Sequence, residues 1–135
     1  MDHPLRAVLQ QVDAGSCPGS FNFHCHTLCS DGSLDPVALI EQATRRGLHH
    51  LAVTDHHSSH AHAPMRAWLE KQQLQGRTVP TLWSGMEISA LLKGCLVHVL
   101  ALGFELDHPA LRPYNRGDAA TGEALRADSV VQAIH

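Results

Sequence analysis

The sequence has little positive charge and no long apolar run, and these two absences exclude broad classes of function. Only two of the 135 residues are lysine, Lys71 and Lys93, and the formal net charge is −3 with histidine neutral. A protein that holds long nucleic acid by bulk charge needs a basic surface, so that class is disfavoured. The longest mostly apolar run, from Leu96 to Leu106, is too short to span a bilayer. We therefore expect neither a long nucleic acid partner nor a membrane partner.

The sequence also shows neither the cysteine spacing of a disulfide scaffold nor a secretion signal. The four cysteines form no CxxC pair and are too sparse for a disulfide framework, so we interpret them as small buried residues: Cys17, Cys25, Cys29 and Cys95. Residues 1–12 lack the basic start and apolar stretch of a secretory signal. With 44% apolar and 17% charged residues, the chain is typical of one globular domain, and we expect it to be cytoplasmic.

Histidine, in contrast, is abundant. The chain has 12 histidines, and eight of them lie at positions 24, 26, 49, 50, 56, 57, 60 and 62. The cluster is neither contiguous nor terminal, so it does not resemble a purification tag. Metal ligation is the leading explanation for such enrichment.

The apolar periodicity predicts an α/β fold. Short strands are expected at residues 21–26, 50–54 and 79–84, with helices between them that begin near Asp35-Pro36, an N-cap pair, and at Pro64. Gly85 interrupts the third strand, and Lys93-Gly94 is a turn between extended segments at 86–91 and 96–104. Further helices are expected at residues 5–12 and 122–134. Alternation of strands and helices indicates parallel βαβ units.

Candidate ligands follow the ends of these strands, which is where α/β sheets collect functional residues. His24 and His26 are two residues apart on a strand, so both imidazoles point to one face and can reach one ion. Asp55 and His56 end the second strand, and Glu87 follows the third. Asp31 lies on a loop that can fold back over this edge, although Asp31-Gly32 could also be only a turn.

The alternatives for the other histidines remain open. His98 lies between two valines, where it needs a hydrogen bond or a metal to offset burial. His49 and His50 are interpreted as structural, and solvation is the default interpretation of His57, His60 and His62. A zinc site using Cys25 and Cys29 is disfavoured because Cys25 alternates with the histidines and should face the other way.

Several of these segments, taken in order, resemble the PHP (polymerase and histidinol phosphatase) family. The resemblance runs from about Phe21 to Phe104, and its motifs are HCHTLCSDG at residues 24–32, LAVTDH at 51–56, GMEI at 85–88 and VHVL at 97–100. It implies the N-terminal part of a metal-dependent phosphoesterase. The implied fold is a partial, distorted (β/α)7 barrel, of which this chain would hold the N-terminal half only. Residues 1–20 would form a lead-in helix, and residues 21–135 a PHP domain truncated before its C-terminal metal motifs.

The resemblance also implies roles for the candidate residues. By analogy, His24 and His26 bind one ion, Glu87 bridges it to a second, His98 ligates the second, and Asp31 and His56 hold a third. Up to three divalent ions are implied in a complete domain, with Zn, Mn or Fe favoured by the mixed ligands and Mg as a further candidate. Asp55 would orient a ligand or move a proton.

The implied reaction is hydrolysis of a small phosphate ester by a metal-activated water, with a nucleotide or short oligonucleotide as a candidate substrate.

The sequence departs from the family pattern after His98. A later histidine-proline strand and a final Asp-x-His motif are not present, and His108-Pro109 comes too soon to replace the first of them. An open half-barrel would leave a strand edge uncovered, through which copies could self-associate. Two rival hypotheses remain: a non-catalytic metal-binding fragment that lacks the distal ligands, and a metal hydrolase of non-phosphate substrates.

Overall fold

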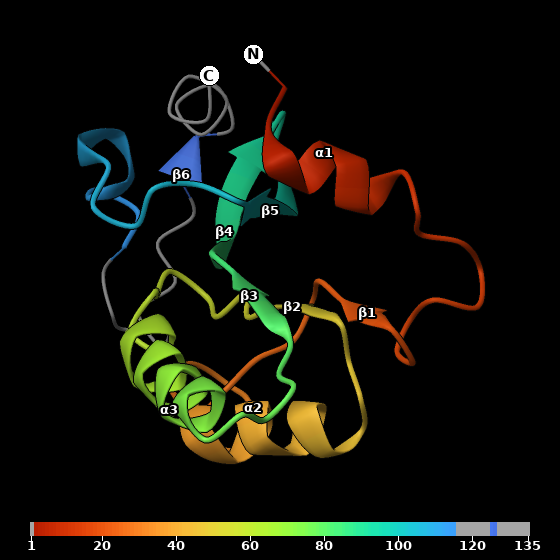
Figure 1. The fold of residues 1–135 in the computed structure, drawn as a ribbon. Coiled ribbons are helices and arrows are strands. Elements are labelled where there is room, and N and C mark those ends of the chain that lie inside the picture. The colour runs from red at the N-terminus through yellow and green to blue at the C-terminus, as the bar shows by residue number, and fades with distance from the viewer. Residues whose placement is uncertain (1, 116–124, 127–135) are drawn as a thin grey trace.

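A computed structural model of the chain describes residues 2–115 and 125–126 (Figure 1). In chain order the elements are α1 (Pro4–Leu9), β1 (Phe21–Asn22), α2 (Pro36–Arg45), β2 (His50–Ala52), α3 (His62–Leu74), β3 (Thr81–Trp83), β4 (Gly85–Leu92), β5 (Cys95–Leu102), the 3-10 turn η1 (Pro109–Leu111) and β6 (Leu125–Arg126). The α/β class predicted from the sequence is confirmed. Among the described residues, no helix is long and apolar enough to cross a membrane.

The first half of the chain forms a parallel sheet covered by two helices. β2 lies between β1 and β3, with His50 opposite both Phe21 and Thr81. In Figure 1, α2 and α3 lie side by side beneath these strands. Ile40 of α2 and Met65 of α3 are fully buried in the core that they share with β2. This arrangement confirms the parallel βαβ units.

The helix α2 begins where the sequence predicts. The carboxylate of Asp35 accepts hydrogen bonds from the backbone N–H groups of Val37 and Ala38 at 3.0 and 3.1 Å, and Pro36 occupies the first helical position. Gly47, with φ +72°, follows the end of the helix. The helix α3 begins two residues earlier than predicted, at His62 instead of Pro64.

The first strand is shorter than predicted, because regular pairing covers only Phe21 and Asn22. Beyond it, the side-chain oxygen of Asn22 accepts from the backbone N–H of His24 (3.1 Å), and the chain pairs again only at Cys25, whose carbonyl accepts from the N–H of Thr54 (2.8 Å). His24 and His26 therefore lie just past the strand and not at its end.

A second sheet contains the antiparallel hairpin of β4 and β5. Lys93 and Gly94 form its two-residue turn with φ +49° and +83°, which confirms the predicted turn. Gly85 begins β4 instead of interrupting a strand: a Cβ there would lie 2.5 Å from the carbonyl oxygen of Val53, so glycine permits this close approach.

The helix predicted at residues 122–134 is wrong at two positions. Leu125 and Arg126 form β6, whose parallel pairing with Ala90 and Leu91 of β4 replaces helical hydrogen bonds at these residues. The remainder of that predicted helix lies outside the described residues.

The two sheets meet where the segment after β2 runs along β4. The backbone N–H of Glu87 donates to the carbonyl of Asp55 at 3.1 Å, and the N–H of His57 donates to the carbonyl of Glu87 at 3.0 Å. This junction brings the carboxyl end of the parallel sheet against the hairpin, and every candidate ligand lies around it.

Candidate metal centre

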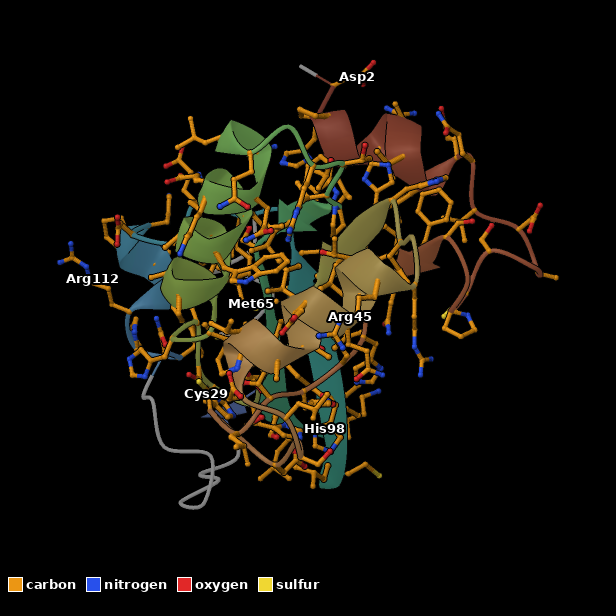
Figure 2. The ribbon with its side chains drawn as sticks, turned by 60° about the horizontal axis from the view of Figure 1, so that its bottom comes forward. Asp2, Cys29, Arg45, Met65, His98 and Arg112 are labelled. Atoms are coloured by element: carbon orange, nitrogen blue, oxygen red, sulfur yellow. The ribbon has the colours of Figure 1, made fainter. Side chains whose placement is uncertain are left out.

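Four imidazoles surround one carboxylate at the junction of the two sheets. Glu87, which is only 5% exposed, carries its side chain from β4 into this cluster. Its Oε2 atom lies 3.0 Å from Nε2 of both His24 and His26, and its Oε1 atom lies 3.4 Å from Nδ1 of His98 on β5. Figure 2 shows His98 at the end of the molecule opposite Asp2.

A second carboxylate, that of Asp31, closes the other side of the cluster. Its Oδ1 atom lies 3.3 Å from Nδ1 of His26, and its Oδ2 atom lies 3.3 Å from Nε2 of His56. The rings of His26 and His56 stack with centroids 4.7 Å apart. The structure thus brings together all six residues that the sequence singles out as metal ligands.

The six side chains form an inner and an outer set. The inner side chains of His26, His56 and Glu87 are 21%, 20% and 7% exposed, whereas the outer ones of His24, Asp31 and His98 are 55%, 65% and 45% exposed. Each pair of inner residues combines with one outer residue into a group whose ligand atoms lie within 4.8 Å of one another: His24, His26 and Glu87; His26, Asp31 and His56; and His56, Glu87 and His98.

These residues fit divalent metal ions. The buried Nδ1 atom of His26 has no hydrogen-bond partner among residues 2–115 and 125–126, although a carboxylate oxygen lies 3.3 Å away. A buried polar atom without a partner is costly, and an ion bound at Nε2 would relieve that cost, because the ring hydrogen would then lie on Nδ1, facing the carboxylate of Asp31. Imidazoles combined with carboxylates suit Zn, Mn or Fe better than Ca.

Asp55 lies beside the cluster but belongs to none of the three groups. Its fully buried carboxylate accepts three hydrogen bonds of 2.6 Å, from the backbone N–H and the hydroxyl of Thr27 and from the hydroxyl of Ser30. These contacts hold the loop that leads from His26 to Asp31. They favour the orienting role expected for Asp55, whereas its expected role in proton transfer stays a prediction.

Thr27, Ser30 and Gly32 were not recognised from the sequence as residues that shape the site. A Cβ on Gly32 would lie 2.2 Å from the carbonyl oxygen of His26, and the Gly32 N–H donates to the carbonyl of Thr27 at 2.9 Å. Only glycine fits where the loop folds back so closely. Thr27 and Ser30 lie within two residues of the candidate ligands His26 and Asp31, and this closeness in the sequence could have indicated their role.

Three other predictions concern cysteine and histidine side chains outside the cluster. Cys25 and Cys29 pack partly buried against the apolar core, as expected, whereas Cys17 and Cys95 are exposed, so the prediction of buried cysteines is wrong for these two. Burial, followed by the charge of Asp55, raises the pKa of the Cys25 thiol to about 12. His50 accepts a hydrogen bond from the indole N–H of Trp83 (3.1 Å) at the start of β2, which supports its structural interpretation. His57 and His62 are buried instead of solvated, whereas His60 is exposed. Burial, followed by the charge of Arg66, lowers the pKa of His62.

Comparison with known proteins gives two informative relatives. The chain is 33% identical over 91 residues to the 5'-3' exoribonuclease Rnm of Escherichia coli, covering 67% of this chain and 30% of that protein. It is also 33% identical over 92 residues to a 3',5'-nucleoside bisphosphate phosphatase of Chromobacterium violaceum, covering 68% of this chain and 30% of that protein. The chain therefore spans about a third of the length of these relatives. No family model matches the sequence.

Two solved structures share the fold. One is assigned as a metal-dependent phosphoesterase from Bifidobacterium adolescentis, with 32% identity, a TM-score of 0.56 and coverage of 70% of this chain and 31% of that one. The other is described as an amidohydrolase from Chromobacterium violaceum, with 29% identity, a TM-score of 0.60 and coverage of 68% and 30%.

Proposed function

Because this chain belongs to the PHP family and matches the N-terminal part of its metal-dependent phosphoesterases, we propose that it hydrolyses a phosphate ester at a centre of divalent metal ions. The observation that carries this proposal is the convergence of four imidazoles and two carboxylates from four segments of the chain on one site. Such a set is far more specific than a single pair of histidines. The metal roles of His24, His26, Asp31, His56, Glu87 and His98 are part of the proposal.

Lone-pair chemistry limits how these residues share ions. A neutral imidazole offers one lone pair to a metal, so His26 and His56 each serve one ion although each belongs to two groups. A carboxylate has two oxygens, so Glu87 can serve two ions. The assignment that the family resemblance implies counts each histidine once and has one ion held by His24, His26 and Glu87. A second would be held by Glu87 and His98, and a third by Asp31 and His56, each with room for further ligands.

The chain's own residues then position a phosphate ester. Ions held here would neutralise phosphate oxygens and lower the pKa of a bound water. The outer residues His24 and His98 are about half exposed, so a substrate would approach from their side of the cluster. The buried side of the cluster excludes water, and the loop clamped by Asp55 keeps Asp31 over the site.

A nucleotide or a short oligonucleotide is the proposed substrate class. Relatives named as an exoribonuclease and a nucleoside bisphosphate phosphatase support it. The scarcity of lysine in the chain argues against capture of long nucleic acid by bulk charge. We further propose that residues 21–135 form part of a distorted (β/α)7 barrel, that the ions are Zn, Mn or Fe, and that the protein acts in the cytoplasm. Self-association through the uncovered strand edge stays a prediction.

Two rival functions have specific support. In the assignment above, two of the three proposed ions have only two ligands each among the described residues, which favours a metal-binding protein without catalysis. The structural relative described as an amidohydrolase favours hydrolysis of a non-phosphate substrate.

A metal titration and two substrates separate the three functions. The protein is stripped with a chelator, reloaded with Mn²⁺ or Zn²⁺, and assayed with an aryl phosphate and an aryl amide. Metal-dependent cleavage of the phosphate, lost in His24→Ala and retained in the exposed control His60→Ala, supports the proposal. Tight metal binding without turnover would leave the non-catalytic fragment, and cleavage of the amide alone the other hydrolase.

A further inference from the structure

We propose that His57 is a positioning residue of the metal centre, which fixes His56, Glu87 and His98 relative to one another without binding an ion. The inference rests on the proposed function, since it concerns the same site. His57 follows a candidate ligand directly, yet it is only 4% exposed and belongs to none of the three metal-capable groups. Its imidazole instead takes part in the hydrogen bonding that joins the two sheets.

The imidazole of His57 continues the hydrogen bonding with β4 at the point where the backbone of its own segment turns away from that strand. The segment after β2 pairs with β4 through the N–H of Glu87 to the carbonyl of Asp55, then through the N–H of His57 to the carbonyl of Glu87. At His57 the backbone turns away with φ +47°. The next outward N–H of β4, that of Ser89, then donates to Nε2 of the His57 ring at 3.1 Å.

The second ring nitrogen fixes the tautomer. Because Nε2 accepts from a backbone N–H, it carries no hydrogen, and Nδ1 is the protonated nitrogen. Nδ1 lies 3.0 Å from the carbonyl oxygen of Tyr114, to which it donates. Both nitrogens are therefore engaged with the protein, which explains why His57 is not a ligand although it adjoins one.

Three candidate ligands are linked to His57. His56 is its neighbour in the chain, and Glu87 accepts its backbone N–H. His98 pairs with Ser89 across the hairpin, so the hydrogen bond from the Ser89 N–H to the ring also holds the strand position opposite His98. The Ser89 hydroxyl lies 3.2 Å from Nδ1 of His98, the nitrogen that also faces Glu87. A shift of the His57 ring would therefore move the group of His56, Glu87 and His98, whereas His24 and His26 come from the segment after β1.

Two substitutions of His57 separate positioning from simple filling of space. Asn tolerates the positive φ and can donate to Tyr114, but its side chain is too short to reach Ser89. Gln extends one bond further, so its amide oxygen can accept from the N–H of Ser89 in place of Nε2. His60→Asn, at an exposed histidine of the same loop, is the matched control.

The measurements are Zn²⁺ affinity by calorimetry and, in metal-free protein, hydrogen exchange of the Ser89 amide by NMR. Loss of a side chain that supports a ligand typically weakens metal binding by about 10- to 100-fold. We expect His57→Asn to weaken binding of Zn²⁺ at least about tenfold and to speed exchange of the Ser89 amide by a similar factor. His57→Gln should keep both values within about threefold of wild type, as should His60→Asn.

Either of two results overturns the inference: unchanged exchange and affinity in His57→Asn, or equal losses in His57→Asn and His57→Gln. Wild-type protein that takes up no Zn²⁺ or Mn²⁺ would instead refute the proposed function. In that case the exchange of the Ser89 amide alone decides whether His57 holds the hairpin. Ser89→Ala gives a further check, because it removes the hydroxyl but keeps the backbone N–H that donates to the His57 ring, so the amide should stay protected.

Discussion

Replacement of Asp55 by asparagine tests whether this buried carboxylate holds the loop that carries Asp31. The substitution keeps size and shape but removes the negative charge. The carboxylate accepts three hydrogen bonds of 2.6 Å, two from Thr27 and one from Ser30. An amide presents one acceptor and one donor group, so one of the two carboxylate positions would then face these donors with N–H instead of oxygen.

The expected loss follows from the strength of these bonds. A hydrogen bond to a charged group contributes about 1.5–3 kcal/mol, against about 0.5–1.5 kcal/mol for a neutral pair. Over three bonds, Asp55→Asn should lower the free energy of unfolding by about 3 kcal/mol. The opposing effect is relief of the cost of burying a charge, which exceeds the bonding gain only where a charge is poorly satisfied. Here both oxygens of Asp55 accept hydrogen bonds, so we expect the lost hydrogen-bond energy to exceed the gain from no longer burying a charge.

Urea unfolding of metal-free protein measures this loss, and Asp35→Asn is the matched control. Asp35 is an exposed carboxylate that caps α2, and asparagine caps helices about equally well, so the control should change stability by less than about 0.5 kcal/mol. Asp55→Asn should also weaken metal binding through Asp31, whereas Asp35→Asn should not. A variant Asp55→Asn within about 1 kcal/mol of wild type, or more stable than it, would refute the clamp.

Three more predictions concern the site and its surroundings. Glu87→Gln removes the charge common to two metal-capable groups and should weaken binding of Zn²⁺ at least about tenfold in calorimetry; unchanged affinity would show that Glu87 is not a shared ligand. Gly32→Ala places a Cβ 2.2 Å from the carbonyl oxygen of His26 and should destabilise the metal-free protein by about 1–3 kcal/mol in urea; no change would contradict the close approach. The buried thiol of Cys25, whose pKa is raised from 9.0 to about 12, stays protonated in the folded state where the unfolded thiol ionises, so its contribution to stability is present below pH 9 and is lost as pH rises toward 12. Alkylation at about pH 8.5 should accordingly modify exposed Cys95 long before Cys25, and equal rates would contradict this burial.

Local signals predicted most of the regular structure. The N-cap Asp35 with Pro36, and the turn at Lys93-Gly94, depend on a few neighbouring residues, and both appear where the sequence indicates them. The alternation around His24 likewise separated the face of the histidines from that of Cys25. Residues 125–126 were predicted wrongly because pairing with a distant strand replaced helical hydrogen bonds there.

Partners distant in sequence were beyond prediction. Asp55 lies 28 residues from Thr27 and 25 from Ser30, so no local pattern indicates that its carboxylate binds their loop. His57 is similar, because its ring meets Ser89 32 residues away and Tyr114 57 residues away. In the sequence His57 is one more histidine in a polar loop. Only the approach of β4 to the segment after β2 gives it a distinct position.

The pairing register of β4 with β5 links a local sequence signal, the turn at Lys93-Gly94, to the position of His98 in the metal centre. A two-residue turn at Lys93-Gly94 makes Leu92 pair with Cys95, and this pairing places Ser89 opposite His98. Since side chains alternate between faces, Glu87, Ser89 and His98 then share one face of the hairpin. A slip of β5 by one residue would turn His98 to the other face, where Val97 and Val99 pack against an apolar core that includes Met86 and Ile88 of β4. Burial of those valines and the geometry of the turn therefore fix the same register, and that register puts His98 beside Glu87.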